Sequence, residues 1–359
     1  MNLYNNPLYM EDVARTAMLP LPWEKLAGKT VLLSGATGLL GSFLVDVLMS
    51  RNESGMDCCV YALSRNEKRA KDRFSIWNNK HLRFITYDIN KPFFDNSIGK
   101  TDFILHLASN THPLQYSTDP IGTITTNIIG LQNILDFAVA HDAERVAFAS
   151  SNEIYGENRG DVEFFDEKYC GYIDSNTLRA GYPESKRCGE ALCQAYIRQK
   201  DLDIVIPRFT RSYGPTMLPS DTKAVSQFIR KAVSGQDIVL KSKGTQYYSF
   251  TYMSDAISGL LTVLLRGEKG EAYNIADASS DIMLKDLAAI IADSVKRQVL
   301  YEIPEETEKL GYSMATKARL NGNKLKSLGW NPVYTINSGI NRTISILKSM
   351  SDWPMDHTF

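Results

Sequence analysis

Between residues 29 and 208, short continuous apolar runs alternate with longer stretches whose apolar positions recur every three or four residues. A short apolar run bounded by polar turn residues predicts a buried strand, and the longer spacing predicts an amphipathic helix. Regular alternation of the two is typical of a parallel, doubly wound α/β sheet. Strands are expected at 29–34, 58–63, 83–87, 103–106, 145–149 and 203–207, and helices at 42–50, at 121–141 and through Tyr182 and Lys186.

The two ends of the chain follow other patterns. Residues 1–28 carry one helical period, at 10–17, which Pro20 and Pro22 end, so this part is expected to form an added N-terminal helical arm. Beyond residue 208 the alternation loosens, which predicts a smaller lobe over residues 209–359. Its expected helices are 222–233, 255–265 and 285–295, and its expected strands are 238–241 and 271–275.

Composition narrows the class of protein. With 359 residues and 43% hydrophobic content, the chain can bury a sizeable core in one large unit or two fused lobes. A net charge of −1 without a Lys/Arg block gives no electrostatic footprint for nucleic acid. No window approaches the ~18 apolar residues of a membrane span, and the five cysteines lack CxxC spacing. We therefore expect a soluble, cytoplasmic protein with buried free thiols, no metal site, and no nucleic-acid or membrane partner.

A glycine-rich turn, Gly35-Ala-Thr-Gly38-Leu-Leu-Gly41, follows the first expected strand and precedes a helix. A strand that turns at once into a helix can hold a pyrophosphate only if no Cβ blocks the backbone, and the helix N-terminus then favours the anion. The alternative is a tight structural turn without a ligand. In this strand–turn–helix context we expect a dinucleotide to contact Gly35, Thr37, Gly38, Leu39, Leu40 and Gly41.

Tyr182 and Lys186 stand four residues apart in a helical segment, so their side chains share one face. A nearby ammonium stabilises a phenolate, and we therefore expect the pKa of Tyr182 to fall toward the range of a general base. Because Tyr and Lys are common on helix surfaces, the pair alone is weak evidence for a catalytic site. Two other features strengthen this interpretation, namely the glycine turn and the strand at 145–149, which ends in Ser150-Ser151-Asn152-Glu153.

With these three features in this order, the chain resembles the extended short-chain dehydrogenase/reductase family, and within it the NAD(P)-dependent epimerases and dehydratases of nucleotide-activated sugars. The resemblance implies a Rossmann-like doubly wound parallel sheet over 29–208 and a smaller, discontinuous α+β C-terminal substrate lobe. Segments near 245–280 are expected to return to the Rossmann domain. Further matching pieces are Tyr87-Asp88-Ile89, His106-Leu-Ala-Ser109, Asn127, Pro207-Arg208, Tyr213-Gly214-Pro215 and Phe250-Thr-Tyr-Met-Ser-Asp255.

The end of the second expected strand bears on the choice of cofactor. An acidic residue there would accept hydrogen bonds from the adenine ribose and favour NAD, but Ser64 and Arg65 stand at this place. A hydroxyl followed by a cation suits a 2′-phosphate, so we expect NADP, with NAD and a solvated helix start as the alternatives. Besides Tyr182 and Lys186, the resemblance implies cofactor contacts from Asp88, Ile89, Leu107, Ala108, Ser109, Asn127 and Arg208.

The resemblance also implies roles in chemistry. Ser151 is the hydroxyl partner of Tyr182, which removes the proton of the sugar 4-OH, while Lys186 binds the nicotinamide ribose. Glu153 stands where dehydratases and decarboxylases carry an acid and where plain 4-epimerases have a small or apolar residue. Its alternative is an exposed loop carboxylate. Asn152 departs from the glucose-type 4,6-dehydratases, which have an Asp there as proton donor, because an amide is no acid.

Two departures concern the substrate. Most relatives carry an Arg where this chain has Tyr248, whereas Arg211 replaces a usual Asn. We infer that the arginine has migrated across the pyrophosphate site, since a bidentate cation there is hard to dispense with. The stretches 106–135 and 179–186 are especially similar to nucleoside-diphosphate-glucuronate decarboxylases. These decarboxylases and the mannose-type dehydratases keep the Glu and have Ser in place of Asn152. The substrate contacts expected are Ser109, Thr111, Asn152, Arg179, Arg211, Gln227 and Tyr248.

These features predict an enzyme, a homodimer by resemblance, that modifies a nucleoside-diphosphate sugar through a transient 4-keto intermediate and recycles its NAD(P). A dehydratase- or decarboxylase-like lyase is favoured, and a nucleotide-sugar 4-epimerase is the alternative. From another class, a non-catalytic dinucleotide-binding sensor is disfavoured, because Tyr182 and Lys186 are both present.

Overall fold

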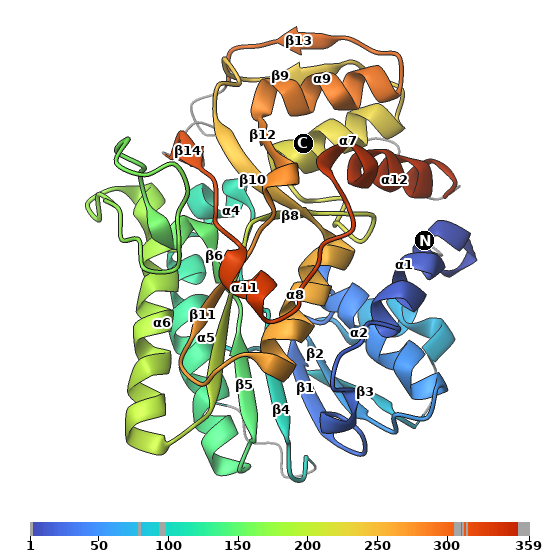
Figure 1. The fold of residues 1–359 in the computed structure, drawn as a ribbon, viewed down its shortest axis with the longest axis vertical. Coiled ribbons are helices and arrows are strands. Elements are labelled where there is room, and N and C mark those ends of the chain that lie inside the picture. Colours follow the sequence, from blue (N-terminus) through green and yellow to red (C-terminus); the bar gives the residue numbers. More distant parts are fainter. Residues whose placement is uncertain are drawn as a thin grey trace.

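The computed structural model describes residues 3–77, 80–92, 98–304, 310, 312–313 and 315–350. Its centre is a sheet whose strands run in the order β11-β7-β5-β4-β1-β2-β3, all parallel, with the short β6 (Ser150–Ser151) paired to β7 (Figure 1). The strands are β1 Thr30–Ser34, β2 Cys59–Ser64, β3 Leu82–Thr86, β4 Phe103–His106, β5 Arg145–Phe148, β7 Ile204–Phe209 and β11 Ala272–Ile275.

Helices cover both faces of this sheet. Alternate strand residues face opposite cores, so that Leu32 and Ile104 belong to one core while Val31 and Leu33 belong to the other. Strands buried on both faces have near-continuous apolar runs, which is why the sequence marked them clearly. The helices are α2 (Leu39–Glu53), α3 (Glu67–Arg73), α5 (Pro120–Ala140), α6 (Gly181–Lys200) and α8 (Met253–Arg266).

The order of the strands reverses between β1 and β4. From β1 the chain continues to β2 and β3 on one side, and β4, β5 and β7 lie on the other. At such a switch point the loops that follow neighbouring strands separate and leave a crevice at their carboxyl ends, where ligands of open α/β sheets bind. The glycine turn follows β1, and residues 107–112 follow β4.

A smaller lobe lies beyond the carboxyl ends of the strands (Figure 1, top). Its sheet has β10 in the centre, antiparallel to β12 and parallel to both β14 and β8, and a second sheet pairs β13 with β9. The strands are β8 Arg211–Tyr213, β9 Ile238–Leu240, β10 Tyr247–Tyr252, β12 Asp281–Met283, β13 Val299–Tyr301 and β14 Lys317–Ala318. The helices are α7 (Ala224–Val233), α9 (Leu284–Ser294), α11 (Asn323–Ser327) and α12 (Ile336–Lys348).

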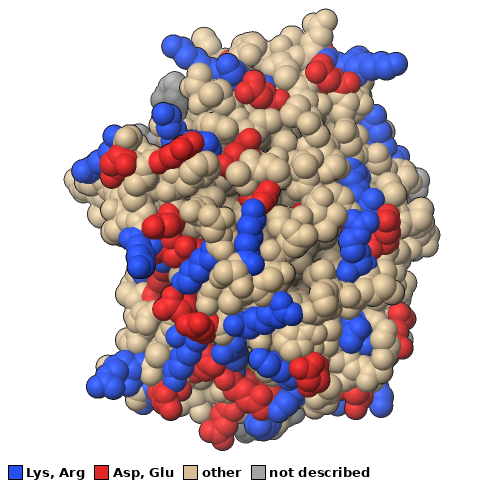
Figure 2. Space-filling view, viewed as in Figure 1, with Lys and Arg blue, Asp and Glu red and all other residues tan. Residues whose placement is uncertain are grey.

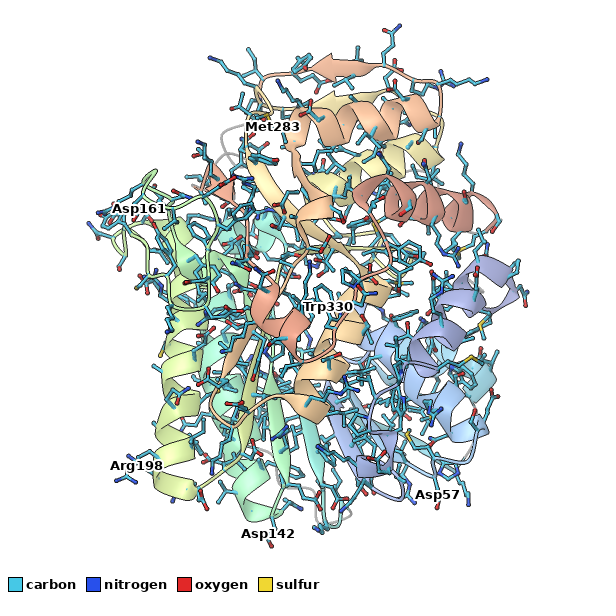
Figure 3. All side chains as sticks on the ribbon, in the orientation of Figure 1. Asp57, Asp142, Asp161, Arg198, Met283 and Trp330 are labelled. Carbon is cyan, nitrogen blue, oxygen red and sulfur yellow. The ribbon has the colours of Figure 1, made fainter. Side chains whose placement is uncertain are left out.

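The two parts are interleaved in sequence. Strand β10 lies in the small lobe, α8 packs on the main sheet, and β11 pairs with β7 in that sheet. Trp330 (Figure 3) attaches the segment that follows α11 to α8, because its indole N–H donates to the Ser258 hydroxyl at 2.9 Å.

The N-terminal arm forms α1 (Pro7–Ala17) and connects both parts through two fully buried carboxylates. Asp46 on α2 accepts hydrogen bonds from Tyr4 at 2.9 Å and from the Trp77 indole at 2.7 Å, and pairs with Arg73 at 2.5 Å. Asp12 on α1 accepts from three groups of the small lobe. These are the hydroxyls of Tyr252 (2.7 Å) and Tyr334 (2.5 Å) and the guanidinium of Arg342 (2.9 Å).

Both signs of charge are interspersed on the face seen in Figure 2, without a field of one sign. None of the helices in the described part of the chain combines the length and apolar character that crossing a lipid bilayer requires. Cys58 and Cys193 are buried thiols, whereas Cys170 and Cys188 are exposed, so the expectation of burial is wrong for these two.

Candidate active site

The glycine turn is shaped by two glycines that the fold itself requires. Gly35 has φ +72°, and a Cβ there would lie 2.8 Å from the backbone nitrogen of Ala108. A Cβ on Gly41 would lie 2.2 Å from the carbonyl oxygen of Gly35. Gly38 differs, because its φ is −81° and its nearest neighbour would be that same oxygen at 3.3 Å. Packing within the protein therefore accounts for Gly35 and Gly41, whereas a Cβ at Gly38 would meet a single neighbour, and its backbone at the start of α2 fits a phosphate.

We expect Gly38→Val to abolish dinucleotide binding while leaving the fold intact, because its side chain would occupy the place of the phosphate. Calorimetric titration measures the binding, and the thermal midpoint reports the fold. Gly99→Val is the matched control, since a Cβ there meets no atom within 4 Å. Unchanged cofactor affinity in a folded Gly38→Val protein would contradict the assignment of the turn.

The end of β2 carries the groups expected to select the cofactor. Ser64 is buried and its hydroxyl accepts a hydrogen bond from the Asn66 backbone at 3.2 Å, while Arg65 is exposed. Arg69 on α3 reaches back to the glycine turn and donates to the Thr37 carbonyl at 3.4 Å. The arginines lie near enough for the charge of Arg65 to lower the pKa of Arg69, although burial has the larger effect. Two guanidiniums thus flank the strand end.

A chain of hydrogen bonds fixes the start of α6. The Ser109 hydroxyl, after β4, donates to Asn127 at 2.7 Å, and Asn127 donates to the Ser185 hydroxyl at 2.9 Å. Ser185 in turn donates to the Tyr182 carbonyl at 2.8 Å. Because Asn127 is fully buried and engaged on both sides, it holds the Tyr/Lys helix against the end of the sheet.

The other residues expected to contact the cofactor lie at different positions in the fold. Asp88 caps the turn after β3 by accepting from the Asn90 backbone at 3.1 Å, and the Ile89 side chain packs against Gly130 of α5. Leu107 and Ala108 press against the glycine turn. Arg208 is buried in a structural network. It donates to Glu190 at 2.6 Å, to Tyr155 at 2.8 Å and to the Glu167 carbonyl at 2.8 Å, and these contacts give it a structural role.

Ser151, Tyr182 and Lys186 come together at the carboxyl end of β5 and β6. Burial lowers the pKa of Lys186 to about 7, and its ammonium donates to the Ala149 carbonyl at 2.9 Å. It also lies 4.9 Å from the centre of the Phe148 ring. The Ser151 hydroxyl accepts from the Glu153 backbone at 3.2 Å, which turns the chain so that the carboxylate follows the hydroxyl directly.

The pKa of Tyr182 shifts in the direction opposite to the expected one. Burial raises the pKa of the phenol to about 12, and the negative charge of Glu153 adds to this. Hydrogen bonding with Ser151 and the positive charge of Arg179 oppose the rise without cancelling it. The prediction of a lowered pKa is therefore wrong, because it counted a neighbouring ammonium and left out the loss of solvation.

Glu153 is half-buried and forms an ion pair with the buried Arg179. One terminal nitrogen of Arg179 lies 2.7 and 2.6 Å from the two carboxylate oxygens. The guanidinium stacks on the Tyr116 ring at 4.5 Å, and Tyr116 stacks on Tyr182 with ring centres 4.8 Å apart. The sequence analysis missed Tyr116, which lies on the short helix α4 (Pro113–Thr118). Its only sequence signal was its place within the 106–135 stretch.

Arg211 and Tyr248 meet on neighbouring strands, β8 and β10. The guanidinium carbon lies 3.4 Å from the centre of the Tyr248 ring. The charges of Arg211, Glu153 and Arg179 all act on the pKa of Tyr248, so the pair borders the catalytic cluster. One terminal nitrogen of Arg211 is buried and has no hydrogen-bond partner among the described residues. A buried donor without a partner is costly, which marks this nitrogen as a place for a ligand acceptor.

The other expected substrate residues give weaker signals. Asn152 is buried directly beside Ser151, and Thr111 is half-buried in the segment after β4. Gln227 on α7 donates to the Thr222 carbonyl at 2.6 Å.

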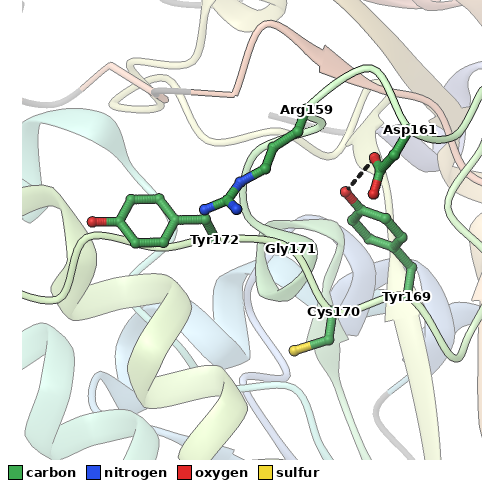
Figure 4. A pocket seen from close by; sticks show the side chains of 6 residues that line it. All are labelled: Arg159, Asp161, Tyr169, Cys170, Gly171 and Tyr172. Atoms are coloured by element: carbon green, nitrogen blue, oxygen red, sulfur yellow. Dashed lines mark hydrogen bonds between the residues drawn. The ribbon is translucent and has the colours of Figure 1, made fainter.

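A separate open depression of about 240 Å³ lies on the 159–172 loop (Figure 4). There Tyr169 donates to Asp161 at 2.9 Å and Arg159 covers the Tyr172 ring, so its side chains are engaged with one another. Within the described ranges, no three His, Cys, Asp or Glu residues are grouped to hold a metal ion.

Comparison with known proteins places the chain. Residues 31–276 match the NAD dependent epimerase/dehydratase family. The chain is 32% identical over 313 residues to UDP-glucuronic acid decarboxylase 6 of Arabidopsis thaliana, which covers 86% of each protein. Its fold is similar to that of a dTDP-glucose 4,6-dehydratase from Streptomyces venezuelae with NAD bound (TM-score 0.78, 24% identity, 91% of this chain and 100% of the other). It is also similar to a UDP-glucuronic acid 4-epimerase from Bacillus cereus in complex with UDP-glucuronic acid and NAD (TM-score 0.75, 20% identity, 89% and 99%). With its glycine turn and its Ser151, Tyr182 and Lys186 at one sheet edge, this chain belongs to the NAD-dependent epimerase/dehydratase family.

Proposed function

We propose that the protein is a nucleotide-sugar lyase that oxidises its substrate at C4 and then removes the C6 carboxylate of a hexuronic acid as carbon dioxide. The observation that carries the proposal is the Glu153–Arg179 ion pair beside Tyr182, because a plain oxidation and reduction at C4 needs no such pair. Similarity to UDP-glucuronic acid decarboxylases supports the same choice.

The first step depends on the cluster at the sheet edge. Tyr182 removes the proton of the 4-OH, and the Ser151 hydroxyl holds that oxygen in place. The glycine turn and Lys186 would hold a nicotinamide dinucleotide, which would supply reversible hydride transfer at C4. The cluster is closed to water, since Ser151, Tyr182 and Lys186 are all buried.

The second step follows from the product of the first. With a ketone at C4, the carboxylate attached to C5 is part of a β-keto acid. Such an acid loses carbon dioxide readily, because the electron pair of the broken C5–C6 bond is delocalised into the C4 carbonyl. Glu153 and Arg179 flank this position, and their pairing keeps the guanidinium oriented there.

Recognition of an acidic substrate is assigned to Arg211. Its buried nitrogen has no hydrogen-bond partner in the described part of the chain, and its stacking on Tyr248 orients the guanidinium for a carboxylate or phosphate oxygen. Arg179 is paired with Glu153, whereas Arg211 has no carboxylate partner among the described residues and keeps its positive charge available to the substrate.

Two other reactions of the same class remain candidates. Dehydration at C5 and C6 is supported by the same carboxylate, but Asn152 cannot be the acid that protonates a leaving hydroxyl. Epimerisation at C4 requires only Ser151, Tyr182 and Lys186. It gives the Glu153–Arg179 ion pair no role in the reaction. A dinucleotide sensor would need neither Tyr182 nor Lys186.

Incubation with a panel of nucleotide sugars, monitored by mass spectrometry, tests the proposal. Loss of 44 mass units from a nucleoside-diphosphate hexuronate is the expected result. Loss of 18 from a neutral hexose would identify a dehydratase. An unchanged mass with a new proton-NMR pattern of the sugar would identify an epimerase, and either outcome would overturn the decarboxylase proposal.

We also propose that NADP binds more tightly than NAD, because Arg65 and Arg69 flank the end of β2 where an acid would favour NAD. The expected difference is ~1–3 kcal/mol, the range of a hydrogen bond to a charged group. Titration of both cofactors into the wild type and into Arg65→Ala measures it. Lys68→Ala is the matched control, an exposed cation at the start of the neighbouring helix α3. Equal or tighter binding of NAD by the wild type would refute the preference.

A further inference from the structure

A histidine and a buried aspartate meet at the edge of the catalytic cluster, joining two parts of the chain that are 109 residues apart. The Nδ1 atom of His112 lies 3.1 Å from one oxygen of Asp221, whose side chain is 4% exposed. The same oxygen accepts the Lys223 backbone N–H at 2.9 Å, and the other accepts the Lys223 ammonium at 2.9 Å. The carboxylate is therefore held on three sides.

The charge state of Asp221 fixes the tautomer of the imidazole. Burial alone would raise the pKa of the carboxyl, but Lys223 and His112 hold it well below its usual range. An ionised carboxylate only accepts hydrogen bonds, so the Nδ1 atom of His112 must carry a proton. The Nε2 atom is then the ring nitrogen that can take up and transfer a second proton. It makes no hydrogen bond to any residue that the structure describes, and the His112 side chain is 18% exposed.

His112 is connected to the catalytic phenol through α4. It is the N-cap residue of this helix, which also carries Tyr116. Tyr116 stacks on Tyr182, and the charge of Asp221 acts on Tyr116 together with those of Glu153 and Arg179. The imidazole is therefore bonded to a carboxylate whose charge reaches the ring that stacks on Tyr182, and it is partly exposed to solvent.

The proposed reaction requires a proton that the cluster does not supply. When carbon dioxide leaves, the C5–C6 electron pair forms an enolate with the C4 oxygen, and C5 must be protonated before the hydride returns. Tyr182 exchanges its proton with O4, Asn152 is an amide, and Glu153 is paired with Arg179. His106 is fully buried, and burial lowers its pKa to about 3, so it carries one proton only.

We propose that His112, oriented by Asp221, donates its Nε2 proton to C5 after decarboxylation and is reprotonated from solvent. The electron pair of the enolate C4=C5 bond forms the C5–H bond while the N–H pair stays on Nε2, and a lone pair of O4 restores the C4 ketone. This inference rests on the proposed lyase function and adds the proton donor to it. The charged and titratable groups coupled to the His112–Asp221 pair are Lys223, Arg230 and Tyr116.

His112→Asn tests the proposal, because an asparagine side chain keeps a donor for Asp221 and lacks the Nε2 atom. In single-turnover experiments, we expect carbon dioxide release at the wild-type rate and product formation slowed by roughly 10²–10⁴. Reduced nicotinamide absorbance at 340 nm should persist, and added imidazole should restore part of the rate. In deuterium oxide, deuterium at C5 should appear at the same reduced rate. His141→Asn, a surface histidine bonded to the Gly99 carbonyl, is the control.

Asp221→Asn should slow the same step, because an amide no longer fixes the tautomer. Wild-type rates of C5 protonation in His112→Asn would overturn the role of His112 while leaving the lyase function standing. If the wild type releases no carbon dioxide and takes up no deuterium at C5, the proposed function fails and this inference fails with it.

Discussion

Tyr182→Phe is expected to reduce turnover by at least the ~10²–10⁴ that a positioned acid–base group contributes. The substitution removes one hydroxyl and keeps the ring, so the stacking on Tyr116 at 4.8 Å persists and the site keeps its shape. The 4-OH then has no acceptor for its proton, and hydride transfer from C4 stops with it. Mass spectrometry of the product and the 340 nm absorbance in a single turnover measure both steps.

Tyr196→Phe is the matched control for this variant. It lies on the same helix, and its hydroxyl donates to Asp136 away from the cluster. Calorimetric titration of the nucleotide sugar should show similar affinity for both variants. A near-normal rate in Tyr182→Phe would show that another group removes the 4-OH proton.

Glu153→Gln is expected to slow the overall reaction by roughly 10²–10⁴ while C4 oxidation still proceeds. The amide keeps the shape of the carboxylate but not the charge that orients Arg179, so the step after hydride transfer suffers. Reduced nicotinamide should accumulate at 340 nm. The same charge raises the pKa of Tyr182, so its removal lowers that pKa. The pH limb of C4 oxidation should therefore move to lower pH.

Glu184→Gln controls for the loss of a carboxylate, since Glu184 lies in the first turn of α6 and accepts from Ser175 on the surface. Normal turnover of Glu153→Gln, with no deuterium at C5 in either the variant or the wild type, would contradict this prediction. Glu153 would then be a structural carboxylate, and the 4-epimerase alternative would gain.

The strands of the main sheet could be predicted closely because each is buried on both faces and forms a continuous apolar run. The expected strand 103–106 coincides with β4, and others differ by a residue or two. The helix expected at 42–50 begins earlier, at Leu39, because Gly38 is already its N-cap. In the small lobe, β8 and β10 carry polar and aromatic residues whose role depends on pairing, and the apolar pattern did not predict them.

Family membership is confirmed, and it followed from motifs that are contiguous in sequence, such as the glycine turn and the Tyr182–Lys186 spacing. What could not be predicted depends on contacts between distant segments. The pairing of Glu153 with Arg179, the stack of Tyr116 on Tyr182, and the approach of His112 to Asp221 all arise from folding. The pKa of Tyr182 was misjudged for the same reason, since burial is a tertiary property. The homodimer, the cytoplasmic location and the NADP preference stay predictions.

The two carboxylates that tie down the N-terminal arm impose an order on biosynthesis. The hydrogen-bond partners of Asp46 lie within 42 residues of it in the sequence, so the arm can pack on α2 while the ribosome is still synthesising the main sheet. The partners of Asp12 lie 240, 322 and 330 residues further along the chain. A segment made among the first therefore holds a charge that is neutralised only when the last helix has emerged. Because domains form from the N-terminus onward during synthesis, the small lobe docks last, and a chain that terminates before Arg342 leaves this carboxylate without its cation.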